Sequence, residues 1–563
     1  PGFYFAMDEG ETPPFKGILH PAYGSTEPPW PSYLYGGHNI GYDARRDIGD
    51  FTAPGFDDSQ WPEAVEVTGS PLYARPVPLV RAGEPREYAG LCRQQGRIVA
   101  RLPYGAQITP CFTVRAPAGC VISVATDRYV VPGGPGDDHH VYNGHRVEYI
   151  TREGLQRFEG LNWLYGEKVI YRMDPRVEVV ELAYRESGYD TRVTAAFESS
   201  DPRLDSLVER AQRTLLMCMR DNFMDCPDRE RGQWIGDLSV QVPQVMFLLS
   251  PSARKLVKKS IYDFINLRQG DILVGNVPGS NYREMSAQVL NAISEWGLLA
   301  QYYHYTSDKK TLLQAFEPVV RYLQLWKLTE NGLITRCDKS WWHIWYDHLY
   351  NQDIPVLRNA WYYSALSFAQ TMASLLDDHR FDDFLSQRKD ILSAAFEKNF
   401  WNGRFYASGN FVDDRANAMA VLSGLCPKER YPNIRDILLS VFNSTVYMEN
   451  YILTALCEMG YYEEAYRRMM SRYYNLASNE NSTLWEDFFI QGTKNHAWSG
   501  APATIAFRYF LGLDSTDGFR TFTVNPVSGL FDHMEASFMT KQGPVKVSYH
   551  NGKTEIHYRG KDL

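Results

Sequence analysis

The chain has 563 residues, a length typical of about three domains, and a net charge of −9. Lys and Arg form no stripe, which excludes nucleic acid as a partner. No apolar run reaches the roughly 18 residues of a membrane span, so no membrane partner is expected. The given sequence contains no signal-peptide pattern, as a mature or trimmed form would also lack one, and a bacterial cytoplasmic or periplasmic location stays open.

Aromatic residues are abundant, with 13 Trp, 37 Tyr and 28 Phe. Aromatic rings cover the apolar faces of sugars, but they also fill large cores, and composition leaves both uses open. The eight cysteines include no CxxC and no spacing typical of a metal or disulfide framework. We therefore expect neither a metal nor another cofactor.

Residues 1–196 are predicted to form a β-sandwich region. Runs such as Cys120–Val130 and Val177–Arg185 are rich in β-branched and aromatic residues, and Gly, Pro, Asp and Asn clusters separate them. The loop 137–140 holds Asp and His residues that suit a metal, but no recognised ligand spacing is present. We interpret it as a solvated loop.

Residues 197–513 are predicted to be helical, because apolar residues recur there at helical spacing. The candidate helices lie at roughly 203–219, 237–249, 252–268, 286–305, 309–326, 357–376, 380–399, 416–424, 434–441, 447–459, 461–473 and 496–512. Such a run packs either as an open solenoid or as a closed (α/α)6 toroid. A solenoid requires self-similarity at a fixed period, which the sequence lacks, so the toroid is favoured.

Residues 514–563 return to short alternating strands, with Asn551-Gly552 as a hairpin turn. They are predicted to form a small C-terminal β-sheet domain. The predicted fold is thus multidomain α and β, with a central (α/α)6 toroid between a β-sandwich and this sheet.

The segment from Asp225 to Asp237 interrupts the helical region with six charged residues out of thirteen. A charged run is usually a solvated face, but the Pro, Gly and Trp residues in this one disfavour a plain solvated helix. If the residues after Asp228 are helical, Glu230, Trp234 and Asp237 share one face. A ring beside two carboxylates suits a sugar-binding wall, and burial there keeps a carboxyl group protonated.

This segment resembles the signature of the bacterial α-L-rhamnosidase family, glycoside hydrolase family 78, in the six-hairpin glycosidase superfamily. The matching residues are Asp225, Cys226, Pro227, Arg229, Glu230, Arg231, Trp234, Gly236 and Asp237. The resemblance implies that Glu230 is the general acid. It also implies that Asp225, Arg229, Trp234 and Asp237 line the subsite for the terminal sugar. Asp228 replaces the usual Gln, and Gly232-Gln233 stands where Leu-Gly is common.

Hydrolysis with inversion needs a second carboxylate across the sugar, roughly 6.5–9.5 Å from the first. The stretches 481–487 and 495–502 resemble the TxWE and NHxxxG motifs of the same family. By that match Glu486 is the base and His496 is a sugar contact, with Asp487 as the nearest rival for the base. The first and last helices of a toroid are neighbours, so Glu230 and Glu486 can converge.

A third cluster has three Trp within residues 341–345. It is either a core loop or an aromatic wall, and it resembles the Trp-rich loop of the family. L-Rhamnose is a 6-deoxy sugar whose methyl group needs an apolar partner, and Trp342, Trp345 and Trp485 are expected to supply it. Asp347 is expected to bond sugar hydroxyls. The stretch 413–417 is similar to segments of related toroid glycosidases, but a helix cap explains it equally well.

The predicted function is that of an inverting exo-glycosidase that hydrolyses terminal α-L-rhamnosyl residues of glycans or glycosides, with a terminal L-rhamnoside as its carbohydrate partner. One alternative is another (α/α)6 carbohydrate enzyme, either a different exo-glycosidase or a glycan phosphorylase that replaces the base with phosphate. The other is a non-catalytic carbohydrate-binding protein, which predicts loss of one carboxylate. The oligomeric state is not indicated.

Overall fold

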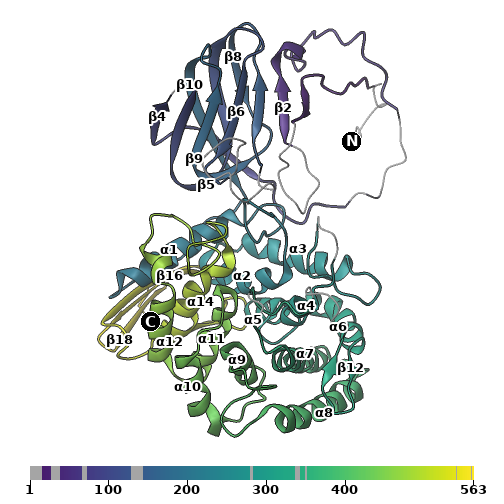
Figure 1. The fold of residues 1–563 in the computed structure, drawn as a ribbon, viewed down its shortest axis with the longest axis vertical. Coiled ribbons are helices and arrows are strands. Elements are labelled where there is room, and N and C mark those ends of the chain that lie inside the picture. The colour runs from purple at the N-terminus through teal and green to yellow at the C-terminus, as the bar shows by residue number, and fades with distance from the viewer. Residues whose placement is uncertain are drawn as a thin grey trace.

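The computed structural model describes residues 15–26, 39–65, 71, 73–94, 96–128, 144–278, 283–336, 343–348, 351–540, 542–558 and 561–562. A β body lies at one end of the molecule and a larger helical body at the other, with a second sheet against the side of the helices (Figure 1). This is a multidomain α and β architecture, as predicted. None of the helices in these ranges is both long and apolar enough to cross a bilayer.

The β body is one extended hydrogen-bonded sheet in the order β1-β2-β7-β6-β9-β5-β10-β3, with β4 and β8 also paired to β5. Its strands are β1 (Tyr23–Ser25), β2 (Ile40–Asp43), β3 (Arg81–Glu87), β4 (Gly90–Gln94), β5 (Arg97–Ala116), β6 (Val121–Thr126), β7 (Val147–Ile150), β8 (Gly154–Glu159), β9 (Leu164–Met173) and β10 (Glu178–Gly188). A short 3-10 helix, Ala44–Arg46, follows β2. Alternate residues of β5, such as Ile98, Ala100 and Leu102, point into a core of their own.

The helical body comprises α1 (Pro202–Met217), α2 (Ile235–Leu248), α3 (Ala253–Asn266), α4 (Ser286–Ala292), α5 (Leu298–Thr306), α6 (Lys309–Gln324), α7 (Ile354–Leu376), α8 (Asp382–Phe400), α9 (Asp414–Leu422), α10 (Tyr431–Ser440), α11 (Val446–Glu458), α12 (Tyr462–Arg472), α13 (Tyr474–Ser478) and α14 (Ala501–Ile505). Short elements connect them: a 3-10 helix at Lys428–Arg430 and two-residue strands at Lys327–Leu328, Ile334–Thr335, Leu513–Asp514 and Thr523–Val524. Aspartates begin several helices, because their carboxylates accept hydrogen bonds from N–H groups of the first turn. These caps are Asp201, Asp308, Asp353 and Asp413.

The helix predicted over 286–305 is wrong: the chain forms α4 and α5, with a break between them. A Cβ at Gly297 would lie 1.7 Å from the carbonyl oxygen of Asn291, so the chain turns where only glycine fits. The break lets the Trp296 indole donate a hydrogen bond of 2.7 Å to the carbonyl of Leu422, at the end of α9. The last predicted helix also divides, into a 3-10 turn (Ala497–Gly500), α14 and a π-helical turn (Ala506–Phe510).

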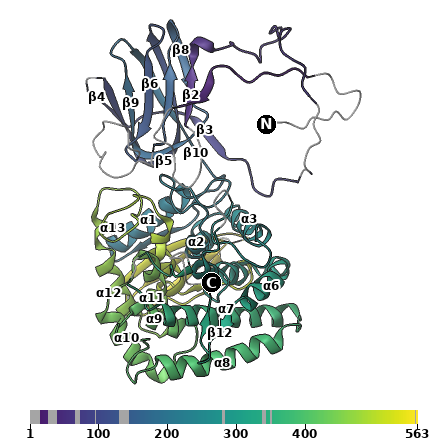
Figure 2. The ribbon, with the colours of Figure 1, turned by 45° about the vertical axis from the view of Figure 1, so that its right-hand side comes forward.

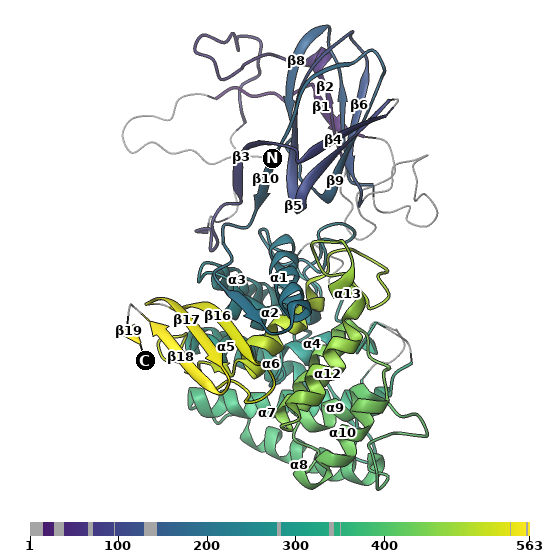
Figure 3. The ribbon, with the colours of Figure 1, turned by 90° about the vertical axis from the view of Figure 1, so that its left-hand side faces the viewer.

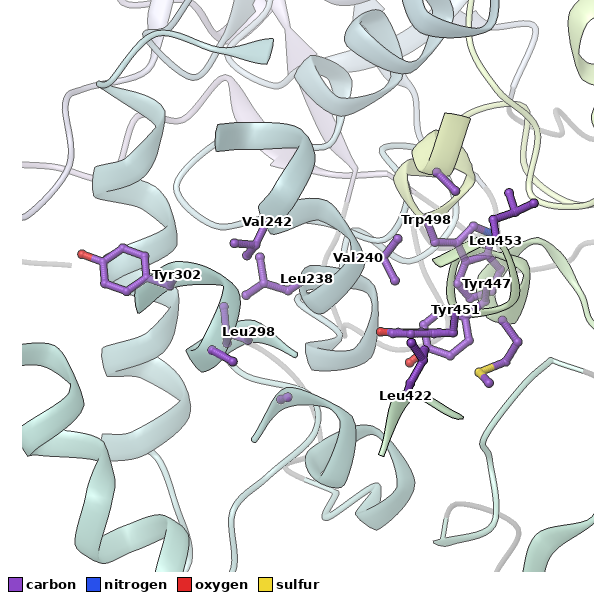
Figure 4. Packing of buried hydrophobic residues seen from close by; sticks show 14 of the residues in the cluster. Leu238, Val240, Val242, Leu298, Tyr302, Leu422, Tyr447, Tyr451, Leu453 and Trp498 are labelled. Carbon is purple, nitrogen blue, oxygen red and sulfur yellow. The ribbon is translucent and has the colours of Figure 1, made fainter. Parts of the chain in front are cut away.

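Six helices contact one another in a closed series: α2 with α4, α4 with α7, α7 with α9, α9 with α11, α11 with α14, and α14 with α2. Every residue of α2 is buried, so this helix runs through the interior rather than along a surface. Figure 4 shows Val240 of α2 on the side of Tyr447 and Tyr451 of α11, with Leu238 and Val242 on the side of Leu298 and Tyr302 of α5. The start of α2 therefore projects polar residues such as Asp237 into an enclosed region.

The second sheet has the order β11-β16-β17-β18-β19. Its strands are β11 (Ala196–Ser199), β16 (His533–Thr540), β17 (Gly543–His550), β18 (Lys553–Tyr558) and β19 (Lys561–Asp562). Asn551 and Gly552 both have positive φ, 46° and 84°, as a type I′ hairpin turn requires. The edge strand β11 comes from the segment before α1, so the sheet joins both ends of the helical region. Figures 2 and 3 show the later strands of this sheet in yellow beside the helices.

Candidate active site

The charged segment between α1 and α2 is a turn followed by extended chain, and α2 begins only at Ile235. The helical face that would align Glu230, Trp234 and Asp237 is therefore absent from this part of the described chain. Instead the chain reverses at Arg231, which has a φ of 57°. This turn places the Trp234 indole nitrogen 2.7 Å from Glu230 Oε2. The ring therefore lies beside Glu230, as expected, but because of a turn and not because of a shared helix face.

Two further carboxylates of the segment are buried beside Glu230. Asp225 accepts a 2.9 Å hydrogen bond from the Gly232 N–H, and Asp237 accepts one of 2.9 Å from His496 Nε2. Burial raises the pKa of both, and the negative charges of Glu230 and Asp237 add to the rise at Asp225. A nearby positive charge would therefore stabilise the anionic form of both carboxylates.

Glu486 lies on the loop before α14 and is almost fully buried. Its Oε2 accepts a hydrogen bond of 2.7 Å from the Thr493 N–H, and its backbone N–H returns one of 2.9 Å to Thr493. Burial raises the pKa of Glu486, but Arg229, His496, the Thr493 N–H and His348 outweigh it and bring the pKa to about 2. Glu486 is thus ionised at neutral pH, as a general base must be.

Arg229 lies between the two candidate catalytic carboxylates. Its Nη2 is 3.1 Å from Glu486 Oε1, and its Nε is 3.6 Å from Glu230 Oε1. Because a guanidinium is one small rigid plane, these two oxygens are no farther apart than about 9.5 Å, the upper end of the range in inverting glycosidases. Residues from opposite ends of the helical region therefore meet at one cation.

His496 is held from three sides. Its Nε2 is 2.9 Å from Asp237 Oδ1, its Nδ1 is 3.2 Å from Thr493 Oγ1, and its ring stacks on Trp498 at 3.8 Å between centroids. The Trp498 indole in turn donates a 2.9 Å hydrogen bond to the Glu486 carbonyl. These contacts connect the Asp237 side of the site to the Glu486 side.

An aromatic wall adjoins these residues. Trp345 stacks on Trp498 at 6.1 Å and contacts Tyr447 at 5.4 Å, and His348 lies 5.9 Å from Trp498. Trp485 precedes Glu486, and nothing in the described part of the chain accepts a hydrogen bond from its buried Nε1. Trp342 lies outside the described residues, as does the loop 137–140.

Asp347 has partners within the protein. Its fully buried carboxylate pairs with Arg415 Nη1 at 3.1 Å and accepts hydrogen bonds from the N–H and hydroxyl of Thr445. Arg415 also pairs with Asp413, which caps α9. The stretch 413–417 is thus a helix cap joined to an ion network, and Asp347 fastens the aromatic loop to it.

Sequence reasoning did not select Trp498, His348 or Gly492. Gly492 has a φ of 73°, and a Cβ there would lie 2.3 Å from Glu486 Oε2, so the loop closes on the carboxylate only with glycine. Trp498 stands two residues after His496, and that proximity was the available signal. The rival Asp487 instead accepts hydrogen bonds from the N–H groups of Phe489 and Gln491 in its own turn.

One group in the site has metal-ligating chemistry. Asp225, Cys226 and His496 offer ligand atoms that lie within 4.8 Å of one another. The Cys226 thiol donates to Asp225 at 2.8 Å, and His496 Nε2 faces Asp237, so these atoms already have protein partners. The acid and base chemistry of the carboxylates needs no metal.

A family model described as the bacterial alpha-L-rhamnosidase 6 hairpin glycosidase domain matches residues 192–510, more than half of the chain. The chain is similar to an alpha-L-rhamnosidase of Formosa agariphila, at 22% identity over 93% of this chain and 60% of that protein. An alpha-L-rhamnosidase of Streptomyces avermitilis is 21% identical, over 90% of this chain and 52% of its own. The chain thus spans a little over half the length of these relatives.

Solved structures resemble the fold. The alpha-L-rhamnosidase of Dictyoglumus thermophilum has a TM-score of 0.76 at 18% identity, over 94% of this chain and 64% of that one. The Streptomyces avermitilis alpha-L-rhamnosidase, solved with L-rhamnose, has a TM-score of 0.76 at 18% identity, over 92% of this chain and 53% of that one. The family match covers both stretches that hold the buried carboxylates, and the chain belongs to the bacterial α-L-rhamnosidase six-hairpin glycosidase family.

Proposed function

We propose that this chain is an inverting exo-glycosidase that releases terminal α-L-rhamnosyl residues from glycans or glycosides. The observation that carries the proposal is the position of Arg229, with Glu230 on one side and the ionised Glu486 on the other. Family membership and the names of the relatives, alpha-L-rhamnosidases, supply the substrate class.

In the proposed reaction Glu230 protonates the departing glycosidic oxygen. Glu486 takes a proton from a water molecule, which attacks the anomeric carbon from the opposite face. The low pKa of Glu486, about 2, keeps the carboxylate unprotonated at neutral pH, so that it has a free site for the proton of water. The bond to the aglycone breaks as the bond to water forms, and the configuration inverts.

Positive charge develops on the sugar ring in the transition state. Asp225 and Asp237 are buried with raised pKa values, so their anionic forms are held at a cost in the free enzyme. An oxocarbenium-like sugar offsets this cost, and the attraction is therefore larger in the transition state than in the ground state. Trp234, Trp345, Trp485 and His496 would complete the sugar subsite beside Arg229.

We also propose that the helices form an (α/α)6 toroid over residues 197–513, after a β-sandwich region over 1–196 and before a C-terminal sheet domain over 514–563. The closed series of contacts from α2 through α4, α7, α9, α11 and α14 back to α2 supports an inner ring of six helices. Such a ring brings its first and last connections together, which is what the approach of Glu230 and Glu486 requires.

The test is a panel of p-nitrophenyl glycosides, with proton NMR of the first sugar anomer released. We expect hydrolysis of the α-L-rhamnoside, with β-L-rhamnose appearing before mutarotation. Free phosphate should leave the product unchanged, which separates hydrolysis from phosphorolysis. Release of α-L-rhamnose first would contradict inversion, and rhamnoside binding without any release would indicate a carbohydrate-binding protein.

A further inference from the structure

We infer that the β body positions the general acid through Trp163, which lies in the loop between β8 and β9; this rests on the proposed function. The guanidinium of Arg231 lies over the Trp163 ring, 3.5 Å from its centroid, and Arg231 Nη2 is 3.4 Å from the Trp163 carbonyl oxygen. Arg231 is the residue next to Glu230. A ring from the β body therefore holds the immediate neighbour of the acid.

The conformation of the turn explains why this contact matters for Glu230. Arg231 has a φ of 57°, a region that residues with a side chain rarely adopt. Its Nε donates a 2.9 Å hydrogen bond to the carbonyl of Pro227, which closes the turn from 227 to 231 around Glu230. Strained backbone persists where its surroundings over-determine it, and here the Trp163 ring is part of those surroundings.

A second arginine, Arg220, connects the same ring to two strands of the β body. The Arg220 guanidinium lies 4.6 Å from the Trp163 centroid, and Arg220 Nη1 donates to Gln107 of β5 at 2.6 Å and to Ser187 of β10 at 3.1 Å. Arg231 also lowers the pKa of Arg220, after burial, to about 10, which indicates two cations close to one aromatic ring. Trp163 thus contacts two cationic side chains at once.

The β body also holds the segment that leads to the base. The Gly105 N–H donates to the Ser482 hydroxyl at 2.7 Å, the Ser482 N–H donates to Glu167 at 2.8 Å, and the Tyr165 hydroxyl lies 3.0 Å from Thr483 Oγ1. Gly105 belongs to β5, and Tyr165 and Glu167 belong to β9; the two strands pair with each other. One sheet therefore contacts the chain on the acid side and on the base side, at the junction of the two bodies in Figure 1. Trp163 is accordingly a positioning residue for the acid.

Leaving-group dependence separates positioning of the acid from a general structural role. A 2,4-dinitrophenolate leaves without protonation, whereas an alkoxide requires the acid. A displaced acid therefore slows an alkyl rhamnoside and spares a dinitrophenyl rhamnoside. Loss of folded protein, or a displaced base, slows both substrates alike.

The experiment compares Trp163→Ala, Trp163→Phe and Trp401→Ala in the full chain, with methyl and 2,4-dinitrophenyl α-L-rhamnosides. Trp401 is the matched control, because the Arg430 guanidinium lies 4.0 Å from its ring centroid at the end of α8, far from the β body (Figure 1). For Trp163→Ala we expect kcat to fall about 100-fold on the methyl glycoside. On the dinitrophenyl glycoside we expect a loss below about threefold, while Trp163→Phe recovers most of the methyl rate and Trp401→Ala changes neither rate.

Equal losses on both substrates, or a Trp163→Ala profile matching that of Trp401→Ala, would overturn the inference. If Trp163→Ala lacks native near-UV dichroism, Arg231→Lys replaces it, since a lysine keeps the charge but loses the planar stack, and the same selective loss is expected. Failure of the wild-type protein to hydrolyse either rhamnoside would instead refute the proposed function.

Discussion

The Arg229 guanidinium lies 3.1 Å from the Glu486 carboxylate, and this ion pair keeps the proposed base ionised in a buried position. Burial alone would raise the pKa of Glu486, so its low value depends on Arg229 and its neighbours. The pair is therefore expected to determine how far into acid the proposed reaction continues.

For Arg229→Gln we predict that the acidic limb of the pH profile of kcat/KM moves to higher pH by about 1–3 units. Activity requires the anionic base, and loss of the cation raises the pKa of Glu486, so activity is lost earlier as the pH falls. The measurement is kcat/KM on p-nitrophenyl α-L-rhamnoside between pH 3 and 8, where a base with a pKa of about 2 gives the wild type no acidic limb and Arg229→Gln is expected to show one. Arg176→Gln, which breaks an exposed pair with Asp174, is the control, and an unmoved limb in Arg229→Gln would refute the assignment.

Glu230→Gln and Glu486→Gln should each lower kcat by about 10²–10⁴-fold, because each amide keeps the shape of the side chain but transfers no proton. Asp487→Asn should stay within about twofold of wild type, because Asp487 only caps its own turn. Circular dichroism should show native spectra for all three variants. Retention of wild-type turnover in either glutamine variant would remove that residue from its role.

Asp225→Asn is expected to stabilise the protein while removing its activity. The folded-state pKa of Asp225 is raised above its ordinary value of 3.8. The folded protein therefore binds this proton more tightly than the unfolded chain does, and its stability falls as the pH rises from 3.8 toward the folded-state pKa. An amide has no such dependence and can still accept from the Gly232 N–H. We predict a gain of about 1 kcal/mol or more in the free energy of unfolding at pH 7, and none near pH 3.

Urea unfolding at the two pH values measures this gain. Asp174→Asn, at a partly exposed position with a lowered pKa, should show no gain at pH 7. A lower stability of Asp225→Asn at pH 7 would mean that its ionised form is favoured in the folded protein.

Local pattern was sufficient for strand runs such as Val177–Arg185 and for most helices, because apolar spacing in segments such as 309–326 is determined by one buried face. The local pattern failed where a tertiary contact determines the backbone conformation. The break at Gly297 depends on Asn291 and on the hydrogen bond from Trp296 to Leu422, neither of which has a local signature. The edge strand β11 likewise pairs with residues of β16 far along the chain.

Residue types in the site could be named from the resemblance, but their partners could not. The link between Glu230 and Glu486 passes through the side chain of Arg229, and its existence depends on two loops closing together. The ion network at Asp347 depends in the same way on Arg415 and Thr445. That Asp347 contacts the sugar stays a prediction. Its buried contacts with Arg415 and Thr445 predict instead that its loss lowers stability, and the two roles can be tested against each other.

For Asp347→Asn we predict a loss of about 3 kcal/mol in the free energy of unfolding, because a fully buried Arg415 loses one of its two carboxylate partners. A residue that only bonds sugar hydroxyls would leave stability unchanged and raise KM alone. Urea unfolding and KM for the rhamnoside, measured on the same preparation, distinguish these outcomes. Asp377→Asn is the matched control, since the Asp377 side chain is 96% exposed and its removal should alter neither quantity. A raised KM at wild-type stability would return Asp347 to the sugar subsite and show that Asp413 alone neutralises Arg415.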